Sequence, residues 1–571
     1  TPSFLAVITA LLRHDALLIR RNALSLLAEK IEDEQDSFDE SEELAFLDML
    51  EDIPQYLQEK SKFEVQDIQI SIYALDILVG AFGEKHPQSF KPFSALLGNM
   101  LGTKVCKRTA GLRSGVQLSL AKMCTVFGVS MLPILTPLMN SLLDSIEPFT
   151  GLSGPEIAGL TDARRDTLEI SLKALNKVVQ TLPKFISPYI SKTLSFLLTR
   201  QESGVEVMAG LSECCGELVD SIATSIEPRI LLPEFYNVFP LLKLPVNECR
   251  FFDMLALHVN TMSKPQIKQF HLQVFKLYLQ AFASHDLLGA EESVAYRESL
   301  LSSFVNLVLK LNEKRTRPLF FKTKEFVHEG PAENNESIMR SRIVLLFHMC
   351  EKLADHLKSI FIPFLSYVFE MAMDELRSFE TIMKRKSVKK TREEVEWHVQ
   401  SLKYVLSTLT KCFLYDAAAS SVQVEGHEKF ITQARFNASV DGLVGLLSCY
   451  EIDKKRNEGD YSMLMSEHVT PCIANFALAA GNDELWKGIH HRVCLKTREE
   501  KSIVRYHSLR TIKVCFEEVG EEYLIMLPET ISFLAELLED QNEDVEQLAR
   551  QVKAELESLS GGESLDNYLF G

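Results

Sequence analysis

The sequence predicts an all-α protein, an α-solenoid of stacked HEAT- or armadillo-like helix pairs. Three observations favour this fold class. Apolar residues recur at helical spacing along the 571-residue chain. Glycine and proline together make up about 8% of it, below the roughly 12% of an average protein. A short motif containing proline also returns at intervals near multiples of about 42 residues, within the range of HEAT and armadillo units.

Three stretches show the amphipathic pattern clearly. The first is expected to begin at an Asp15 cap, the second to run over 166–182 and stop at Pro183, and the third to lie near the end of the chain. Each places apolar residues three or four positions apart, which aligns them on one helix face. These faces are Ala23, Leu24, Leu27 and Ile31; Leu168, Leu172, Leu175, Val179 and Leu182; and Val545, Leu548, Val552 and Leu556.

The recurring motif has the form apolar-apolar-x-proline, and each copy is expected to open a helix. Proline suits the first helical turn, because the amide hydrogen it lacks would have no partner there. The alternative is that these prolines fall at helix starts by general preference, without any repeat. The six copies centre on Pro92, Pro133, Pro188, Pro233, Pro363 and Pro528.

Two segments, 18–24 and 503–509, share an apolar-Arg-x-x-(Ala/Ser)-Leu core that is typical of the second helix of a HEAT unit. We expect the arginines of these cores, Arg20 and Arg505, to tie neighbouring repeats together. At the usual repeat length the chain would hold about 12 units. We divide it into helical repeats over 1–430 and C-terminal repeats with a cap over 431–571.

Charged segments interrupt the pattern and are expected to be insertions. Residues 29–52 carry twelve acidic side chains against one cation, Lys30, and are predicted to form a solvated loop or a loop with a short helix. Basic loops are predicted near 310–324 and 384–392. In a solenoid, insertions of this kind often lie on the binding face.

The two basic segments supply the candidate RNA- or partner-contacting residues. Segment 384–392 could be a solvated loop, a nuclear-localisation patch or a phosphate-contacting loop. Segment 310–324 surrounds Phe320 and Phe321 with cations, a mixture that suits an RNA backbone with stacked bases but equally a protein groove. The candidate residues are Lys314, Arg315, Arg317, Lys384, Arg385, Lys386, Lys389, Lys390 and Arg392.

No motif points to an enzyme, a cofactor or a metal. The sequence has no glycine-rich phosphate loop and no HExxH pair, and the adjacent His490 and His491 would point about 100° apart on a helix. The pair Cys214-Cys215, Trp397 and Trp486 are interpreted as packing residues. The eleven scattered cysteines indicate reduced thiols, and no apolar run long enough for a membrane span is expected.

The net charge of −18 argues against wrapping a long duplex by bulk electrostatics, although local basic patches remain possible. The chain begins at Thr1 without an initiator methionine, which suggests a piece of a longer protein.

The last hundred or so positions resemble the C-terminal end of a known family, whereas residues 1–430 show only a general HEAT pattern. The family is the HEAT-repeat UTP protein of the UtpA (t-UTP) subcomplex of the small-subunit processome, the HEAT repeat-containing protein one family. Gly488 stands where that family usually has proline. The resembling stretches are 435–444, 483–487, 495–498, 519–524, 527–531, 534–540 and 563–570, including Trp486-Lys487 and Leu495-Lys496-Thr497-Arg498.

The resemblance implies a non-enzymatic scaffold of ribosome biogenesis in the nucleus and nucleolus, acting in early pre-rRNA assembly and 18S rRNA maturation. It implies other UtpA and processome proteins as partners, together with the 5′ external transcribed spacer and the U-three snoRNA particle, bound directly or indirectly. It implies no catalytic residues and no membrane. The alternative from the acidic composition is a nuclear transport receptor-like or other HEAT-repeat adaptor.

Overall fold

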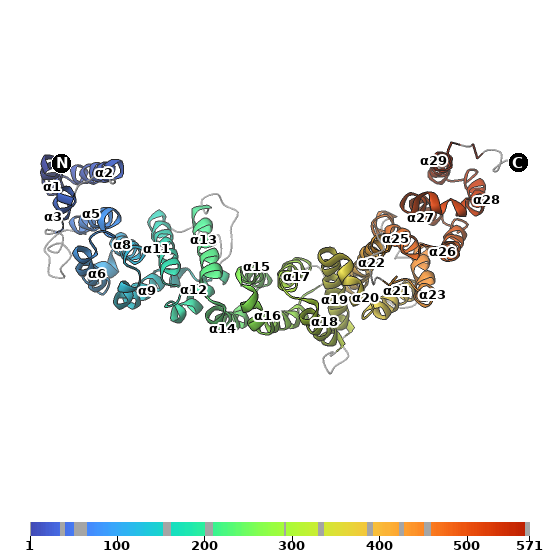
Figure 1. Ribbon diagram of the computed structural model, residues 1–571, viewed down its shortest axis with the longest axis horizontal. Helices are drawn as coiled ribbons and strands as arrows, with labels where there is room; N and C mark the ends of the chain where they lie inside the picture. The colour runs from blue at the N-terminus through green and yellow to red at the C-terminus, as the bar shows by residue number, and fades with distance from the viewer. Residues whose placement is uncertain are drawn as a thin grey trace. The chain divides into compact units, whose positions relative to one another are not determined.

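Every element of the computed structural model is a helix, and the residues it describes include no β-strand (Figure 1). The structure describes residues 2–34, 40–48, 50, 65–151, 161–199, 209–289, 293–328, 336–384, 392–421, 428–449, 458–562 and 564–565. They form two compact units, Thr1–Val274 and Phe275–Gly571, whose boundary falls within helix α16 (Lys264–His285). The predicted all-α fold is confirmed.

In the first unit the helices form two layers. One layer stacks α2, α5, α8, α11, α13 and α15 in chain order, and the other stacks α6, α9, α12 and α14. The helices are α1 (Pro2–Leu12), α2 (Leu17–Glu34), α3 (Glu40–Asp48), α5 (Val65–Phe82), α6 (Pro87–Leu101), α7 (Lys104–Arg108), α8 (Ala110–Phe127), η3 (Gly128–Met131), α9 (Leu132–Ile146), η4 (Glu147–Phe149), α11 (Asp162–Thr181), α12 (Ser187–Thr199), α13 (Ala209–Ser225), α14 (Pro228–Val238), η6 (Phe239–Leu241) and α15 (Pro245–Thr261).

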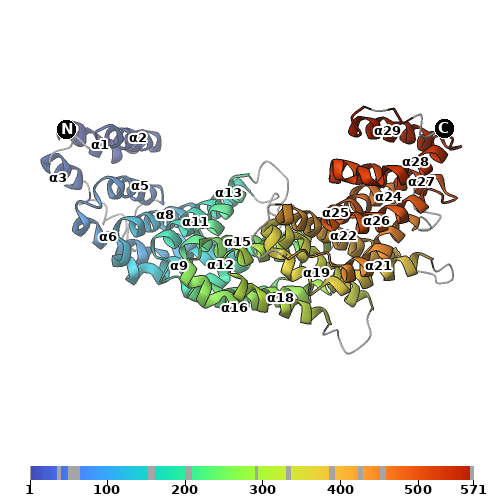
Figure 2. The ribbon, with the colours of Figure 1, turned by 45° about the vertical axis from the view of Figure 1, so that its right-hand side comes forward.

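The second unit repeats this arrangement. One layer stacks α17, α19, α22, α25, α27 and α29, and the other stacks α21, α23, α26 and α28 (Figure 2). Its helices are α17 (Ser293–Leu309), α18 (Glu313–His328), α19 (Glu336–Leu357), η7 (Lys358–Phe361), α20 (Ile362–Leu365), α21 (Phe369–Lys384), α22 (Arg392–Ser421), α23 (Gln433–Gly445), η8 (Leu446–Ser448), α24 (Glu458–Leu464), η9 (Met465–Val469), α25 (Thr470–Ala480), α26 (Asp483–Lys496), α27 (Ser502–Val519), η10 (Gly520–Met526), α28 (Leu527–Leu537) and α29 (Glu543–Leu559).

The core of each unit lies between its layers, and the predicted apolar faces form part of it. All thirteen residues of the three predicted stripes are buried. They lie in α2, in α11 and the residue directly after it, and in α29. The predicted cap at Asp15 is wrong, because α2 begins at Leu17 and Ala16, not Asp15, directly precedes it. At the other end of the chain, Asn542 caps α29, and its side chain accepts a hydrogen bond from the Val545 amide at 3.2 Å.

Polar contacts also join successive helices. Gln117 of α8 is fully buried and donates to Ser145 of α9 at 3.0 Å, while its side-chain oxygen accepts from Ser171 of α11 at 2.9 Å. A buried amide needs such partners, because leaving it unsatisfied would cost free energy of folding. The Gln117 side chain therefore fixes the register of three consecutive helices.

Four of the six motif prolines begin helices as predicted: Pro133, Pro188, Pro363 and Pro528 lie in the first turns of α9, α12, α20 and α28. The expectation is wrong for Pro92 and Pro233, which lie inside α6 and α14. Pro87 and Pro228 open those two helices, and each internal proline removes one helical hydrogen bond.

The acidic segment 29–52 is partly helical where the structure describes it. Helix α2 continues to Glu34 and α3 covers Glu40–Asp48. Glu43 of α3 is buried and lies 2.9 Å from His86, and its hydrogen bonds to Lys85 and His86 hold its pKa below the usual value. At least one of the twelve acidic side chains thus packs against the repeat stack.

Two stretches, Val65–Phe82 and Ala110–Phe149, are long and apolar enough to cross a membrane by length and composition. This finding contradicts the expectation that no such stretch exists. The second stretch comprises α8, η3, α9 and η4, with a positive backbone φ at Gly128, and both stretches contribute to the core described above. Helices buried in a repeat stack reach such hydropathy without a bilayer.

All eleven cysteines lie in the described part of the chain and are free, and ten of them are buried. Burial raises the pKa of Cys106 to about 11 and that of Cys124 to about 12, which keeps both as neutral thiols. Trp397 and Trp486 are buried as well, and Trp486 donates to the Ala477 carbonyl at 2.7 Å. These residues are packing elements, as predicted.

Candidate functional site

The predicted basic segment near 310–324 is mostly helical. Glu313–His328 forms α18, so the loop expected here is wrong. Lys314 and Arg317 are exposed and Arg315 is half-buried. Lys314 and Arg317 lie three positions apart on one face of the helix. Arg317 pairs with Glu313 at 2.9 Å, so its charge is partly neutralised within the segment.

The aromatic residues of this segment are packing elements. Phe320 is buried and contacts Phe364 edge-on, with ring centroids 5.3 Å apart, and Phe321 contacts Tyr367 at 4.7 Å. Lys324 donates to the Tyr367 carbonyl at 2.7 Å. Because these rings hold α18 against the turn after α20, they are not available to stack bases, and only the cations remain as a candidate surface.

The second basic segment falls largely outside the described residues. Lys384 is the last residue of α21 and Arg392 is the first of α22. Arg385, Lys386, Lys389 and Lys390 lie between these helices, outside the part of the chain that the structure describes. A role in binding for this segment remains a prediction.

Arginine–carboxylate pairs connect successive helices, as predicted for Arg20 and Arg505. Arg20 of α2 pairs with Asp67 of α5. Arg505 of α27 makes two 2.7 Å hydrogen bonds to Asp540, in the turn before α29. Planar guanidinium groups match carboxylates in this two-bonded geometry, so the Arg505–Asp540 pair fixes both the distance and the orientation between its two elements.

A second set of arginine contacts lies around α19. Arg342 binds Asp286 with bonds of 2.6–3.0 Å, donates to the Phe326 carbonyl and lies 4.0 Å from the Phe326 ring centre. Arg340 makes two 2.7 Å bonds to Glu375 of α21. These contacts tie α19 to the turn after α16, to the last turn of α18 and to α21.

Arg297 of α17 is fully buried without an ion pair to any described residue. It donates to Gln400 of α22 at 2.7 Å and to Ser293, and its guanidinium lies 5.7 Å from the Trp397 ring centre and 5.8 Å from that of Tyr404. Burial lowers its pKa from the ordinary value. Aromatic faces and neutral acceptors thus replace a carboxylate as the surroundings of this cation.

Two histidines complete the surroundings of Arg297. His285 is 3.0 Å from the Ser341 hydroxyl, and burial, assisted by the Arg297 charge, lowers its pKa to about 3. His348 stacks on Tyr404 with ring centres 4.2 Å apart, and burial also lowers its pKa. Both rings are therefore neutral near pH 7, and Arg297 carries the charge of the cluster.

Sequence reasoning missed this cluster, although a signal for it exists. Arg297 falls at the same helical spacing as the buried apolar residues Leu300, Leu301 and Phe304. A cation in line with such a stripe either extends its charged end to solvent or is buried with polar partners. Only the tertiary structure shows that Arg297 is buried.

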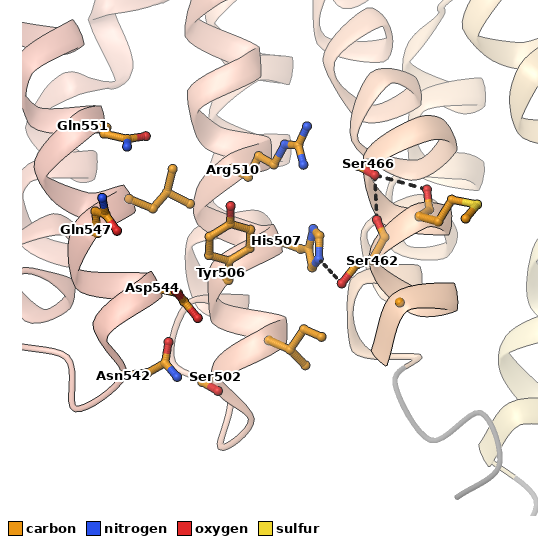
Figure 3. Close-up of a pocket in the computed structure, with 14 residues that line it drawn as sticks. Ser462, Ser466, Ser502, Tyr506, His507, Arg510, Asn542, Asp544, Gln547 and Gln551 are labelled. Atoms are coloured by element: carbon orange, nitrogen blue, oxygen red, sulfur yellow. Dashed lines mark hydrogen bonds between the residues drawn. The ribbon is translucent and has the colours of Figure 1, made fainter. Parts of the chain in front are cut away.

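A polar groove of about 860 Å³ crosses the last helices of the second unit (Figure 3). Its walls come from α24 with η9, from α27 and from α29. We call this feature the C-terminal groove. Its polar lining consists of Ser462, Ser466, Ser502, Tyr506, His507, Arg510, Asn542, Asp544, Gln547 and Gln551.

One wall of the C-terminal groove has an unusual backbone. Residues Met465–Val469 form a π-helical turn between α24 and α25, and Ser466 lies within it. Such turns insert an extra residue into a helix and frequently occur at functional sites. His507 of α27 lies 3.2 Å from the Ser462 hydroxyl, and burial together with the Arg510 charge lowers its pKa to about 4.

No group of three or more histidine, cysteine, aspartate or glutamate residues that could hold a metal occurs in the described ranges. His490 and His491 have separate partners, since His490 lies 2.9 Å from the Thr530 hydroxyl and His491 lies 2.6 Å from a Glu529 oxygen. These separate partners agree with the predicted divergence of the two adjacent side chains on the helix.

Comparisons with known proteins extend the resemblance seen in the sequence. The family model "BP28CT (NUC211) domain" matches residues 261–420, which include Arg297 and Trp397. That match lies outside the stretches that carried the resemblance, so the expectation of only a general HEAT pattern over 1–430 is wrong.

Curated relatives match nearly the whole chain. HEAT repeat-containing protein 1 of Homo sapiens is 28% identical over 100% of the chain, and the homolog from Drosophila melanogaster is 28% identical over 99%. U3 small nucleolar RNA-associated protein 10 of Schizosaccharomyces pombe is 23% identical over 99%. The chain covers only 26%, 26% and 31% of these proteins, respectively.

Solved structures give weaker likenesses. Importin beta is 11% identical over 100% of this chain and 69% of that chain, with a TM-score of 0.35. A Kap95p complex with RanGDP gives 11% identity over 97% of this chain and 71% of that chain, with a TM-score of 0.32.

Homology along the whole chain, with a family domain matched inside it, confirms the resemblance, and the chain belongs to the family of HEAT repeat-containing protein 1 and U3 small nucleolar RNA-associated protein 10.

Proposed function

We propose that the chain is part of a non-enzymatic scaffold of ribosome biogenesis, acting in the small-subunit processome during early pre-rRNA assembly and 18S rRNA maturation. The observation that carries this proposal is the match of nearly the whole chain to a U3 small nucleolar RNA-associated protein. The proposed location is the nucleus and nucleolus. The proposed partners are other UtpA and processome proteins, the 5′ external transcribed spacer and the U3 snoRNA particle.

The architecture supports a scaffold. In each unit, a helix buries its apolar face only against its neighbours in the stack, so the remaining faces of many helices are left for partners. Pairs such as Arg505–Asp540 and Arg342–Asp286 fix the positions of successive helices. A surface held in this way can present several contact sites in fixed order.

Direct RNA contact is the finer part of the proposal. The net charge of −18 means that any contact with phosphates must be local. The exposed cations of α18, Lys314 and Arg317, are the described candidates, together with the half-buried Arg315. The six cations of 384–392 are the second candidate, and their replacement by alanine or glutamine should lower nuclear accumulation or RNA crosslinking without changing the helix content.

The test is purification of the tagged protein from its own cells, followed by gradient sedimentation and crosslinking mass spectrometry. We expect sedimentation with pre-ribosomal particles, precipitation of U3 snoRNA above an unrelated tagged control, and crosslinks to UtpA proteins. Sedimentation only as a free protein, without U3 snoRNA, would overturn the proposal. Nucleotide-sensitive binding to Ran would instead support a transport-receptor-like adaptor.

A further inference from the structure

Four polar side chains that line the C-terminal groove have no partner among the described residues. Arg510 of α27 and Asp544, Gln547 and Gln551 of α29 make no side-chain hydrogen bond or ion pair with any described residue. Figure 3 shows Asp544, Gln547 and Gln551 on α29 and Arg510 on the neighbouring α27. Arg505, one turn before Arg510, is in contrast fully engaged by Asp540 and two carbonyl oxygens.

The charge of the groove argues against a nucleic acid as its ligand. Its lining has one cation, Arg510, one anion, Asp544, and a neutral His507. Binding of single-stranded nucleic acid relies on a positively charged channel, because each phosphate carries a negative charge. A groove with balanced charges lacks that attraction.

The shape and apolar content argue against a docked helix. An amphipathic helix requires an apolar stripe in its groove. The apolar side chains that line this groove are Met463, Ile503 and Leu548, one from each wall, and Leu548 is buried beneath the surface. They offer isolated contacts in place of a continuous stripe.

An extended peptide satisfies the chemistry of the lining. Side-chain amides both donate and accept hydrogen bonds, as do the main-chain N–H and C=O groups that an extended peptide exposes. Gln547 and Gln551 lie four residues apart on α29, about 6 Å along the helix axis. Alternate residues of an extended chain are spaced by about 6.8 Å, so both glutamines can engage the same face of one peptide.

The length of the groove along these helices also suits an extended segment. Its lining runs from Ser502 to Arg510 on α27 and from Asp544 to Gln551 on α29, about 10–12 Å of helix axis. That distance corresponds to about three or four residues of extended chain. The hydroxyl groups of Ser502 and Tyr506 lie between the outer walls and add polar contacts along that path.

We propose that the C-terminal groove binds an extended peptide segment of a partner protein, held through its main chain by Gln547 and Gln551, with an acidic side chain paired to Arg510 and a basic one paired to Asp544. The binding of such a segment does not depend on the processome role proposed above.

The test uses the full chain and a phage-displayed library of random peptides of about 12 residues, longer than the groove requires. Enriched peptides are synthesised with a fluorescent label and titrated by anisotropy. The groove variant carries Arg510→Ala and Gln547→Ala. A matched control carries Arg550→Ala and Gln541→Ala, which remove the same residue types from positions outside the groove lining.

We expect selected peptides to lose affinity by at least about tenfold on the groove variant and to bind the control as tightly as the wild type. Failure to enrich any peptide, or equal binding to groove variant and control, would overturn the proposal. A labelled oligouridine that binds the wild type and is lost only with the groove variant would also overturn it, in favour of RNA. If the groove variant melts below the control, the single variant Gln551→Ala at an exposed position takes its place.

Discussion

Arg505 and Asp540 are joined by two parallel hydrogen bonds of 2.7 Å between α27 and the turn that precedes α29. The carboxylate is buried, with a side-chain exposure of 7%, and the guanidinium also donates to the carbonyl oxygens of Glu499 and Glu500. In the first unit an ion pair with one hydrogen bond, between Arg20 and Asp67, joins α2 to α5. Arginine–carboxylate pairs therefore connect neighbouring helices in both units.

Replacing Asp540 by alanine should destabilise the junction between α27 and α29 by about 1–3 kcal/mol, because it leaves a partly buried guanidinium without its carboxylate. Hydrogen exchange of α29 should report the loss, with α11 in the other unit as an internal reference. The exposed pair of Arg550 and Glu546 supplies the control, since Glu546→Ala should change stability by less than about 0.5 kcal/mol. Equal effects of the two substitutions would contradict the role assigned to Arg505–Asp540.

The same pair should give a dependence on pH. The hydrogen bonds from Arg505 hold the pKa of Asp540 below its ordinary value. A carboxyl group with a lowered pKa in the folded protein adds stability. This stability is fully present above the pKa of the unfolded chain, about 3.9, and is lost as the pH falls through the pKa of the folded protein. Below about pH 4, exchange of α29 should therefore accelerate more in the wild type than in Asp540→Asn, which cannot titrate. A parallel acceleration in both proteins would show that other groups are responsible.

The buried Arg297 predicts an unequal response to two substitutions. Arg297→Ala should destabilise α17 and α22 by about 3 kcal/mol or more, because it leaves a cavity and removes the partner of Gln400. Arg297→Met should cost less, since it fills much of the space and removes the penalty of burying a charge. Hydrogen exchange of the two helices measures both effects. Losses of the same size would show that the polar contacts, and not the volume, dominate at this position.

His285 should make the cluster around Arg297 sensitive to mild acid. Burial and the Arg297 charge lower the pKa of His285 to about 3 in the folded protein, whereas an unfolded histidine titrates near about 6.5. The unfolded state therefore binds the extra proton first, and stability present above about pH 6.5 falls as the pH drops, by about 2 kcal/mol at pH 5. His285→Gln should flatten this dependence in α16 and α19. An unchanged slope would contradict a neutral buried His285.

The sequence carried most of the information on the fold and less on the binding surfaces. Periodicity correctly predicted the buried faces of α11 and α29, because each helix contacts its neighbours along one stripe. The positions of Pro92 and Pro233 could not be predicted, since a second proline a few residues upstream begins each helix. Local sequence patterns therefore predict which face of a helix is buried. Which of two nearby prolines begins a helix depends on how that helix packs against its neighbours.

The candidate surfaces show the same limit. The clustering of the cations of α18 is visible in the sequence. The choice between base contacts and protein packing for Phe320 and Phe321 could not be made from the sequence, because their packing partners Phe364 and Tyr367 lie 44 and 46 residues further along the chain. The C-terminal groove gave no sequence signal at all. Isolated glutamines on an exposed helix are ordinary, and only the packing of α24, α27 and α29 brings Gln547 and Arg510 to one groove.

If α18 contacts RNA, the triple variant Lys314→Ala/Arg315→Ala/Arg317→Ala should reduce the salt dependence of binding to a single-stranded fragment of the 5′ external transcribed spacer. Each lost phosphate contact lowers the slope of log K against log salt by about 0.7, so three contacts would lower it by about 2. The variant Lys104→Ala/Lys107→Ala/Arg108→Ala on α7 makes the same change in net charge at exposed positions and serves as the control. Equal slopes for both variants would show that the cations of α18 act only through the net charge of the protein and make no specific phosphate contacts.

Leu534 tests the packing of the C-terminal repeats. It is 1% exposed in α28, which contacts α26 and α29, so Leu534→Asp would bury a carboxylate without a partner and should cost about 3–5 kcal/mol. Ile525 is 45% exposed in the preceding turn, and Ile525→Asp makes a similar chemical change at the surface with little expected effect. Leu534→Met, which keeps the volume, should cost less than about 1.5 kcal/mol. Melting temperatures of the three variants separate these cases, and a Leu534→Asp protein as stable as Ile525→Asp would show that this face of α28 is not part of the core.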